Sequence, residues 1–358
     1  MKKFAAAAAL FSAAALALSG CATPPEPGAT GTATNTGGAQ SFLACMVSDQ
    51  GGFDDKSFNQ SGYEGLVKAE KDLGVTIKTA ESKNATDFAP NLEAMQAQNC
   101  NLTITVGFLL KEATEAQAKA NPDSHFAIID NNDIVLTNVK SLVFKTSDAS
   151  YLAGYLAAAY TKTGTVATFG GIAIPSVTIF MDGFVDGVAR YNADNGTSVK
   201  VLGWDKDKQD GSFTGDFEDQ SKGQNTTKNF IDQGADIIMP VAGPVGHGAA
   251  AAAREAGDVS IIWVDADGYD TVPQYKDLFL TSVMKEIGAS VFDTVKEAQG
   301  GTFSADPYIG TLANGGVGIA PYHDFDSKIP QEVKDKITQL KADISSGALK
   351  VTSPSDPH

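Results

Sequence analysis

The sequence has few of the residues from which enzyme active sites and metal centres are built. Its 358 residues include four histidines and three cysteines, and it lacks the motifs G-x-S-x-G, H-E-x-x-H and G-x-x-x-x-G-K-[ST]. His247 lies in a glycine-rich turn with no nucleophile evident beside it, which argues against a general base. The acidic run at residues 205–211 has its glycine one position too late for a calcium-binding loop. We therefore expect a protein that is not an enzyme and that needs no metal or cofactor.

Basic clusters are missing as well. The chain has 27 lysines and arginines against 43 aspartates and glutamates, which gives a formal net charge of -16. An acidic surface without a run of basic residues repels the phosphates of nucleic acids and of anionic lipid headgroups. We therefore expect no nucleic-acid partner, and the acidity by itself identifies no ligand.

The one long apolar run lies at the N terminus. Two lysines precede apolar residues 4–18, and Leu18-Ser19-Gly20-Cys21 follows, a pattern typical of an export signal rather than a membrane span. A cysteine after Leu-Ser-Gly resembles the lipobox of bacterial lipoproteins, which implies cleavage after residue 20 and a lipid on Cys21. The alternative is a secreted protein with a chance cysteine. Residues 21–40 have the composition of a flexible tether, so we expect a domain that is lipid-anchored at the outer face of the cell membrane.

Two further cysteines, Cys45 and Cys100, fall inside the expected folded domain. Cys45 lies in the first expected strand and Cys100 just before the third. If these strands are neighbours in a doubly wound sheet, both cysteines lie near the same edge. An exported domain permits a disulfide, so a bridge and a pair of buried thiols both remain open.

From residue 41 onward, strands and helices alternate in two successive rounds. The expected strands are 42–47, 75–79, 102–106, 125–130 and 141–145 in the first round, and 165–169, 198–202, 236–241 and 260–264 in the second. Alternation with short connections predicts an α/β fold with parallel sheets covered on both faces, and its repetition predicts two lobes.

Elements after residue 277 exceed what two lobes need, which suggests that the chain crosses back. We expect residues 41–145 and 278–302 to form the first lobe, so that a late strand and helix complete it. Residues 146–277 and 303–358 would then form the second lobe.

A polar stretch at residues 48–60 separates the first strand from the first helix. Ser57 and Gln60 have the S-x-x-Q spacing of a capping box, which predicts a helix that begins at Phe58. Phe58 and Asn59 would then lie at the carboxyl end of the first strand, where open α/β sheets bind ligands. An aromatic ring there either stacks on a ligand or packs on its own loop.

Four motifs occur in an order seen in a known family: Asp54-Asp55-Lys56-Ser57-Phe58-Asn59-Gln60-Ser61, residues 150–157, residues 241–243 and residues 315–318. Together they resemble the basic membrane protein family, similar to its purine nucleoside receptor A group, from about Phe42 to about Tyr322. Members of this family are lipoprotein substrate-binding components of ABC transporters. The resemblance implies the type I periplasmic-binding-protein fold, with two Rossmann-like lobes and a ligand in the cleft. It implies a transporter permease as partner, and we expect a monomer.

Carried over to this chain, the resemblance implies a nucleoside ligand, purine in particular, and the following binding residues. Phe58 would stack on the base, Asn59 and Asp130 would contact its edge, and Asp49 would line the same side. Gly243, Asp265 and Lys285 would hold the ribose, while Phe180, with Phe184 next, would close the other face.

The sequence departs from the family at Met239-Pro240 and Pro244, beside the ribose contact. Riboflavin and other relatives of a nucleoside therefore remain possible ligands. A receptor that senses a ligand without transport, and an enzyme that acts on a nucleoside or sugar, are the alternative functions.

Overall fold

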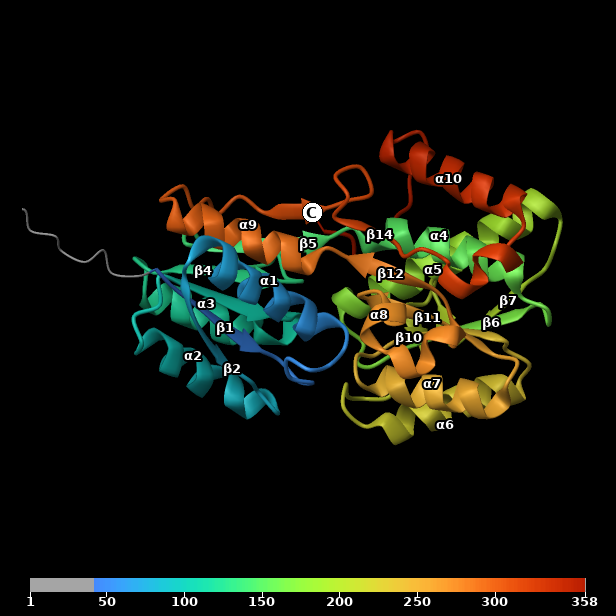
Figure 1. The fold of residues 1–358 in the computed structure, drawn as a ribbon, viewed down its shortest axis with the longest axis horizontal. Coiled ribbons are helices and arrows are strands. Elements are labelled where there is room, and N and C mark those ends of the chain that lie inside the picture. The colour runs from blue at the N-terminus through green and yellow to red at the C-terminus, as the bar shows by residue number, and fades with distance from the viewer. Residues whose placement is uncertain (1–41, 358) are drawn as a thin grey trace, which may run out of the picture. The chain divides into compact units, whose positions relative to one another are not determined.

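The computed structural model describes residues 42–357, which form two α/β lobes (Figure 1). The predicted signal peptide, the tether and Cys21 lie outside the described residues. The strands of the first sheet are, in spatial order, β13 (Tyr308–Gly310), β5 (Val139–Phe144), β4 (His125–Ile129), β3 (Leu102–Val106), β1 (Leu43–Ser48) and β2 (Thr76–Ala80). Those of the second are β14 (Val317–Ile319), β12 (Phe279–Lys285), β11 (Ser260–Asp265), β10 (Ile237–Val241), β6 (Thr165–Gly170) and β7 (Lys200–Leu202).

Helices accompany both sheets. The first lobe contains helices α1 (Phe58–Leu73), α2 (Phe88–Gln96), α3 (Lys111–Ala120) and α9 (Ile287–Gln299). The second lobe contains α4 (Thr146–Tyr160), α5 (Pro175–Asn195), α6 (Gln220–Asp232), α7 (Val245–Ala256), α8 (Gly268–Thr271) and α10 (Gln331–Ser345). Short elements complete the described chain: η1 (Ala85–Asp87), η2 (Phe108–Leu110), η3 (Pro273–Leu278), η4 (His323–Lys328), and the β8 (Trp204–Asp205) and β9 (Asp210–Gly211) ladder. No helix within residues 42–357 has the length and apolar character that a membrane span requires.

The inner strands are buried along almost their whole length. Every residue of β3 and of β10 is buried, as expected for parallel strands that are covered on both faces. All neighbouring strands of the two sheets pair in parallel except β14, which pairs antiparallel with β12. The two sheets also share one strand order, so β1 corresponds to β6, β3 to β10, and β4 to β11. Equivalent strand ends therefore face the site from both lobes.

Helices α4 and α5 pack unusually closely in the second lobe. A Cβ atom at Gly154 would lie 2.1 Å from the Phe184 carbonyl oxygen, and one at Gly187 would lie 2.0 Å from that of Tyr151. Only glycine permits such an approach, because any side chain would meet the backbone of the facing helix. This contact fixes α5, whose N-terminal half reaches the site described below.

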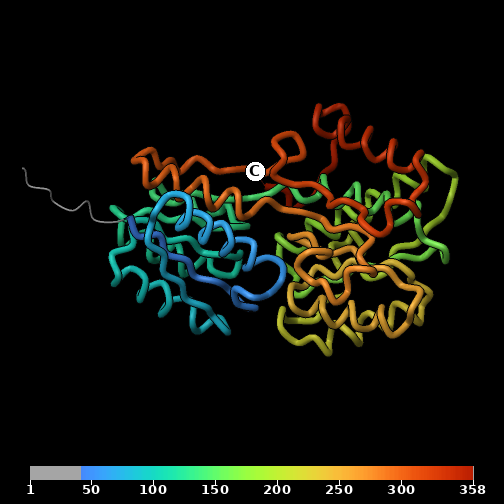
Figure 2. The backbone as a smooth tube through the Cα atoms, viewed as in Figure 1, coloured from blue at the N-terminus to red at the C-terminus, as the bar shows by residue number. Residues whose placement is uncertain are grey.

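The assignment of two late strands to lobes was wrong. Strand β12 pairs with β11 in the second sheet, whereas β13 pairs with β5 in the first. The physical reason is that β11 and β12 are consecutive parallel strands, and consecutive strands in one lobe tend to pair. What returns to the first lobe is α9, which packs against α1 (Figure 2). The chain thus passes between the lobes three times, near residues 145, 286 and 311–316.

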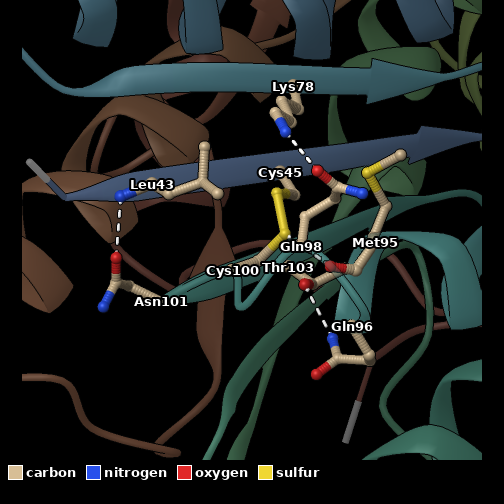
Figure 3. Close-up of a disulfide and its surroundings, with 9 residues drawn as sticks. All are labelled: Leu43, Cys45, Lys78, Met95, Gln96, Gln98, Cys100, Asn101 and Thr103. Atoms are coloured by element: carbon tan, nitrogen blue, oxygen red, sulfur yellow. Dashed lines mark hydrogen bonds between the residues drawn. A yellow bond between two sulfur atoms is a disulfide. The ribbon is translucent and has the colours of Figure 1, made fainter.

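Cys45 and Cys100 form a disulfide in the first lobe (Figure 3). Strand β1 pairs directly with β3, and Cys45 lies opposite Thr103 in that pairing. Cys100 comes two residues before β3, which brings its Cα atom 5.9 Å from that of Cys45. The bridge therefore joins the starts of two central strands. Of the two alternatives that the sequence left open, the structure contains the disulfide and not the pair of free thiols.

Candidate functional site

A cavity of about 500 Å³ lies where carboxyl strand ends of the two lobes meet. Sites between the two lobes of an α/β fold, at the carboxyl ends of the strands, are common places for small ligands. The cavity is lined by all eight residues that the sequence predicts to bind ligand: Asp49, Phe58, Asn59, Asp130, Phe180, Gly243, Asp265 and Lys285. The structure therefore brings together residues that are spread over more than two hundred positions of the chain.

Helix α1 begins at Phe58 as predicted, but the predicted capping box is wrong. The Ser57 side chain makes no capping bond, and the Gln60 amide donates to Glu64 instead of reaching back. Asp55 caps the helix: its carboxylate accepts from the backbone N–H groups of Ser57, Asn59 and Gln60 at 3.0, 2.8 and 3.0 Å. A carboxylate also suits the positive end of the helix dipole. Because Asp55 caps α1, the Ser57 hydroxyl is available to donate a hydrogen bond to another partner.

Asp55 is itself a lining residue that the sequence analysis missed. Burial raises its pKa to about 6, and the three backbone hydrogen bonds act in the opposite direction. The aspartate pair just before the helix start was the available signal, because short acidic side chains favour that position.

Asn59 and Asp49 form a buried pair on the first-lobe side of the cavity. The Asn59 amide nitrogen donates to Asp49 Oδ1 at 3.0 Å and to the Gln50 carbonyl oxygen at 3.2 Å. Burial raises the pKa of Asp49 well above its ordinary value, although the hydrogen bond from Asn59 lowers it. Gly107 makes this arrangement possible, because a Cβ atom there would lie 2.0 Å from Asp49 Oδ2. Its φ of +120° also excludes other residues.

Lys285 stands between two aspartates from opposite lobes. Its Nζ atom lies 2.6 Å from Asp130 Oδ2 and 3.1 Å from Asp265 Oδ1, and all three side chains are buried. Burial lowers the pKa of Lys285, but the attraction of the two carboxylates outweighs it and raises the pKa above its ordinary value. The pKa of Asp130 is raised too, because burial outweighs the effect of the lysine. The lysine thus stays charged in a site with more acids than bases.

Three buried oxygen atoms that lack a hydrogen-bond partner among the described residues belong to this cavity's lining: Gln50 Oε1, Asn59 Oδ1 and Asp265 Oδ1. Lys285 is close enough to Asp265 Oδ1 for attraction, but that contact is not aligned as a hydrogen bond. Buried polar atoms without partners are rare and costly in folded proteins. All three are acceptors, so the cavity is suited to a ligand with several donors.

Aromatic rings line the same cavity. Phe58 is half-buried, and the Lys285 Nζ atom lies 4.7 Å from its ring centroid. Phe180 lies deeper, at 1% exposure, and Phe184 is fully buried and does not belong to the lining. Phe217, which the sequence analysis missed, lines the cavity from the loop before α6 and is half-buried. The loop around Phe217 has no periodic pattern. The only feature of the sequence that could have indicated a role in binding was an aromatic residue among glycines and acidic residues.

Comparison with known proteins identifies the family. Residues 42–352 match the family model described as ABC transporter substrate-binding protein PnrA-like. The chain belongs to this family. The resemblance found in the sequence is therefore confirmed, and a small-molecule ligand and a transporter permease are its expected partners. No group of three or more metal-ligating side chains occurs in the part of the chain that the structure describes.

Individual relatives extend over most of the chain. A Lactococcus lactis protein named ABC transporter nucleoside-binding protein BmpA is 31% identical over 99% of this chain and 99% of its own length. An uncharacterized lipoprotein of Pyrococcus abyssi is 30% identical over 83% of this chain and 72% of its own length. A solved solute-binding protein of an ABC transporter system from Aeropyrum pernix superimposes with a TM-score of 0.79 at 25% identity, covering 88% of this chain and 94% of that one. The predicted fold class is thereby confirmed.

Proposed function

We propose that this protein captures nucleosides, with a preference for purines, and delivers them to the permease of an ABC importer. The observation that carries the proposal is a set of buried acceptor oxygens at Gln50, Asn59 and Asp265, which accept no hydrogen bond from the described residues and line one cavity with aromatic rings. A nucleoside offers donors at both ends, from the N–H groups of its base and from its ribose hydroxyls, and a flat ring between them. The name of the Lactococcus lactis relative supports the same ligand class.

The two ends of the ligand would be held by different groups. Asn59 Oδ1 and Asp49 offer hydrogen bonds to a base edge, while Asp265 Oδ1 and Lys285 suit ribose hydroxyls. We propose Asp130 and Gly243 as further contacts of the base and ribose, respectively.

Stacking is the basis of the purine preference. Phe58 would cover one face of the base, and Phe217 is a stronger candidate than Phe180 for the other, because its ring is not fully buried in the protein. A base–aromatic stack contributes about 1–3 kcal/mol, and the larger purine ring offers more area. Phe58→Ala is therefore expected to weaken binding of inosine roughly tenfold.

Charge distinguishes nucleosides from nucleotides. Four carboxyl groups line the cavity, at Asp49, Asp55, Asp130 and Asp265, against the one ammonium group of Lys285. A phosphate would enter a closed site whose one cationic group, Lys285, already contacts Asp130 and Asp265, so its charge would lack a counter-ion. The proposal therefore excludes nucleoside monophosphates as ligands.

We further propose that the protein is a monomer held at the outer face of the cell membrane by a lipid on Cys21. The Leu18-Ser19-Gly20-Cys21 sequence supports this, as does the name of the lipoprotein relative from Pyrococcus abyssi. Cys21→Ser is expected to release the protein from the membrane fraction, and unchanged retention would contradict the anchor.

A thermal-shift panel of purine and pyrimidine nucleosides, nucleoside monophosphates, riboflavin and sugars tests the ligand class. Purine nucleosides should raise the Tm most, because a ligand that binds only the folded state stabilises it by mass action. The same mixtures, analysed by chromatography, should contain unchanged nucleoside. Stabilisation by riboflavin or a sugar alone would contradict the proposal, and formation of a free base would favour an enzyme instead.

A further inference from the structure

Ser57 connects the two lobes at the edge of the cavity. It is fully buried and lies directly before α1 in the first lobe, where Asp55 rather than Ser57 caps the helix. Its hydroxyl lies 3.1 Å from the Val264 carbonyl oxygen and 3.0 Å from Asp265 Oδ2, both at the end of β11 in the second lobe. One short side chain thus spans the boundary between lobes at the strand end that carries a proposed ligand contact.

This bond determines which oxygen of Asp265 remains for other partners. Oδ2 accepts from Ser57, while Oδ1 has no hydrogen bond and faces Lys285 at 3.1 Å. A carboxylate held at one oxygen cannot rotate freely about its χ2 bond, which is otherwise a soft torsion. The backbone is fixed as well, since Asp265 has the left-handed φ of +67°.

A second bond beside Ser57 joins the same two segments. The Trp263 indole N–H donates to the Lys56 carbonyl oxygen at 3.3 Å, and the ring is 1% exposed. Residues 56 and 57 of one lobe therefore contact residues 263 to 265 of the other. Trp263 is a natural probe of this contact, because the chain has only two tryptophans.

We infer that Ser57 is a positioning residue of the binding site, which docks the first lobe on β11 and turns Asp265 so that Oδ1 is available to a ligand hydroxyl. The docking part of this inference is independent of the ligand. The part that concerns Asp265 rests on the proposed nucleoside function.

The docking part is tested by ¹⁹F NMR of protein labelled with 5-fluorotryptophan, with Trp204→Phe used to assign the two resonances. In the wild type, the Trp263 resonance should show little H₂O/D₂O shift because the ring is buried. Ser57→Ala should expose it and produce a clear solvent shift. The matched control is Ser61→Ala, which removes the hydrogen bond of 2.6 Å that the Ser61 hydroxyl donates to the Ser57 carbonyl oxygen, a bond within the first lobe. Identical spectra for both variants and the wild type would overturn the docking role.

The positioning part is tested by calorimetric titration with inosine and 2′,3′-dideoxyinosine. Ser57→Ala removes a buried hydrogen bond, so it should weaken inosine binding roughly fivefold to tenfold and dideoxyinosine binding clearly less. In an Asp265→Ala background, Ser57→Ala should have a smaller effect on inosine binding than in the wild type, since the two residues are coupled. Equal losses for both ligands, or additive losses in the double variant, would overturn the positioning role.

Two further results keep these tests decisive. If Ser57→Ala does not fold, Ser57→Cys retains the volume with a weaker donor and should show the same effects to a smaller degree. If the wild type binds neither inosine nor any other nucleoside, the proposed function fails, while the ¹⁹F experiment still decides the docking role of Ser57.

Discussion

The two lobes use the same strand end for two different tasks. Asp130 follows β4 and Asp265 ends β11, which are equivalent strands in the two sheets, and both have a left-handed backbone with φ of +62° and +67°. Both contact Lys285, but Asp130 accepts a hydrogen bond at 2.6 Å whereas Asp265 does not. Asp130 thus holds the lysine by a hydrogen bond, whereas Asp265 attracts it by charge and keeps an acceptor for a partner. Equivalent positions in a repeated fold are therefore no guarantee of equivalent roles.

The rest of the cavity shows the same asymmetry. The first lobe contributes a hydrogen-bonded group of side chains, Asp49, Asp55 and Asn59, around the start of α1. Apart from Asp265 and Lys285, the second contributes mainly apolar residues, among them the rings of Phe180 and Phe217. The first lobe is therefore suited to recognise particular donors on a base, and the second to enclose the ligand against it.

The largest effect is expected from replacement of Lys285, which contacts both Asp130 and Asp265. Lys285→Met leaves two buried carboxylates without a counter-ion, so we expect a loss of about 3–5 kcal/mol in the free energy of unfolding. Urea denaturation measures it. Lys334→Met, which removes a pair to the exposed Asp326, should lose less than about 1 kcal/mol. Equal losses in the two variants would show that the buried group of Lys285, Asp130 and Asp265 contributes no more to stability than an exposed ion pair does.

The disulfide exists in one lobe only. It closes a loop with a sequence separation of 55 residues in the first lobe. Loop-closure entropy predicts about 4 kcal/mol of stabilisation for a loop of this length, the upper end of what disulfides usually contribute. The variant with both Cys45→Ala and Cys100→Ala should therefore unfold at lower urea concentration. Hydrogen exchange should become faster in β1 and β3 than in β6 and β10. Uniform acceleration in both sheets would contradict a local effect.

The roles of Asp130 and Asp265 can be distinguished with nucleosides that differ only in the hydroxyl groups of their sugar. Asp265→Ala should weaken ribonucleoside binding by about 1–3 kcal/mol, because ribose donors would lose their acceptor in a closed site. Its effect on 2′,3′-dideoxynucleosides should be much smaller. Asp130→Ala should weaken both classes alike if Asp130 serves the base and the lysine. Titration of one ribonucleoside and its dideoxy analogue decides this, and equal losses for Asp265→Ala would favour a purely structural ion pair.

A smaller effect concerns pH and Asp148, at the start of α4 in the second lobe. Burial raises the pKa of Asp148 to about 6; the charge of Lys145 lowers this pKa, and that of Asp356 raises it. Asp356 is held near the start of α4, because its carboxylate accepts a hydrogen bond from the Ser147 hydroxyl at 2.5 Å. Since the folded-state pKa exceeds the ordinary value of 3.8, the stabilising contribution of the protonated form is lost as pH rises through about 6.

Asp148→Asn should therefore raise stability at pH 8 by roughly 1 kcal/mol and leave it nearly unchanged at pH 4. Melting temperatures at the two pH values measure the difference. The control is Asp123→Asn, at an exposed position, which should show no such pH dependence. A gain for Asp148→Asn that is the same at both pH values would refute the assignment.

Local patterns predicted most of the strands and the start of α1 at Phe58, because buried apolar runs and short connections are visible in the sequence. The residues that line the cavity came from the resemblance to the family, since they are scattered along the chain. The lobe assignment of β12 and β13 could not be predicted in this way, because pairing between distant segments leaves no trace in a periodic pattern. The same applies to the Ser57 hydroxyl, which bonds to residue 264 across 207 positions instead of capping its own helix.

A crystal structure of the protein with inosine bound tests most directly whether the buried acceptor oxygens of the cavity bind the ligand. We expect donors of the ligand within hydrogen-bond distance of Asn59 Oδ1 and Asp265 Oδ1, with the base stacked on Phe58. A ligand bound elsewhere, or bound here with both oxygens still lacking a donor, would contradict that role.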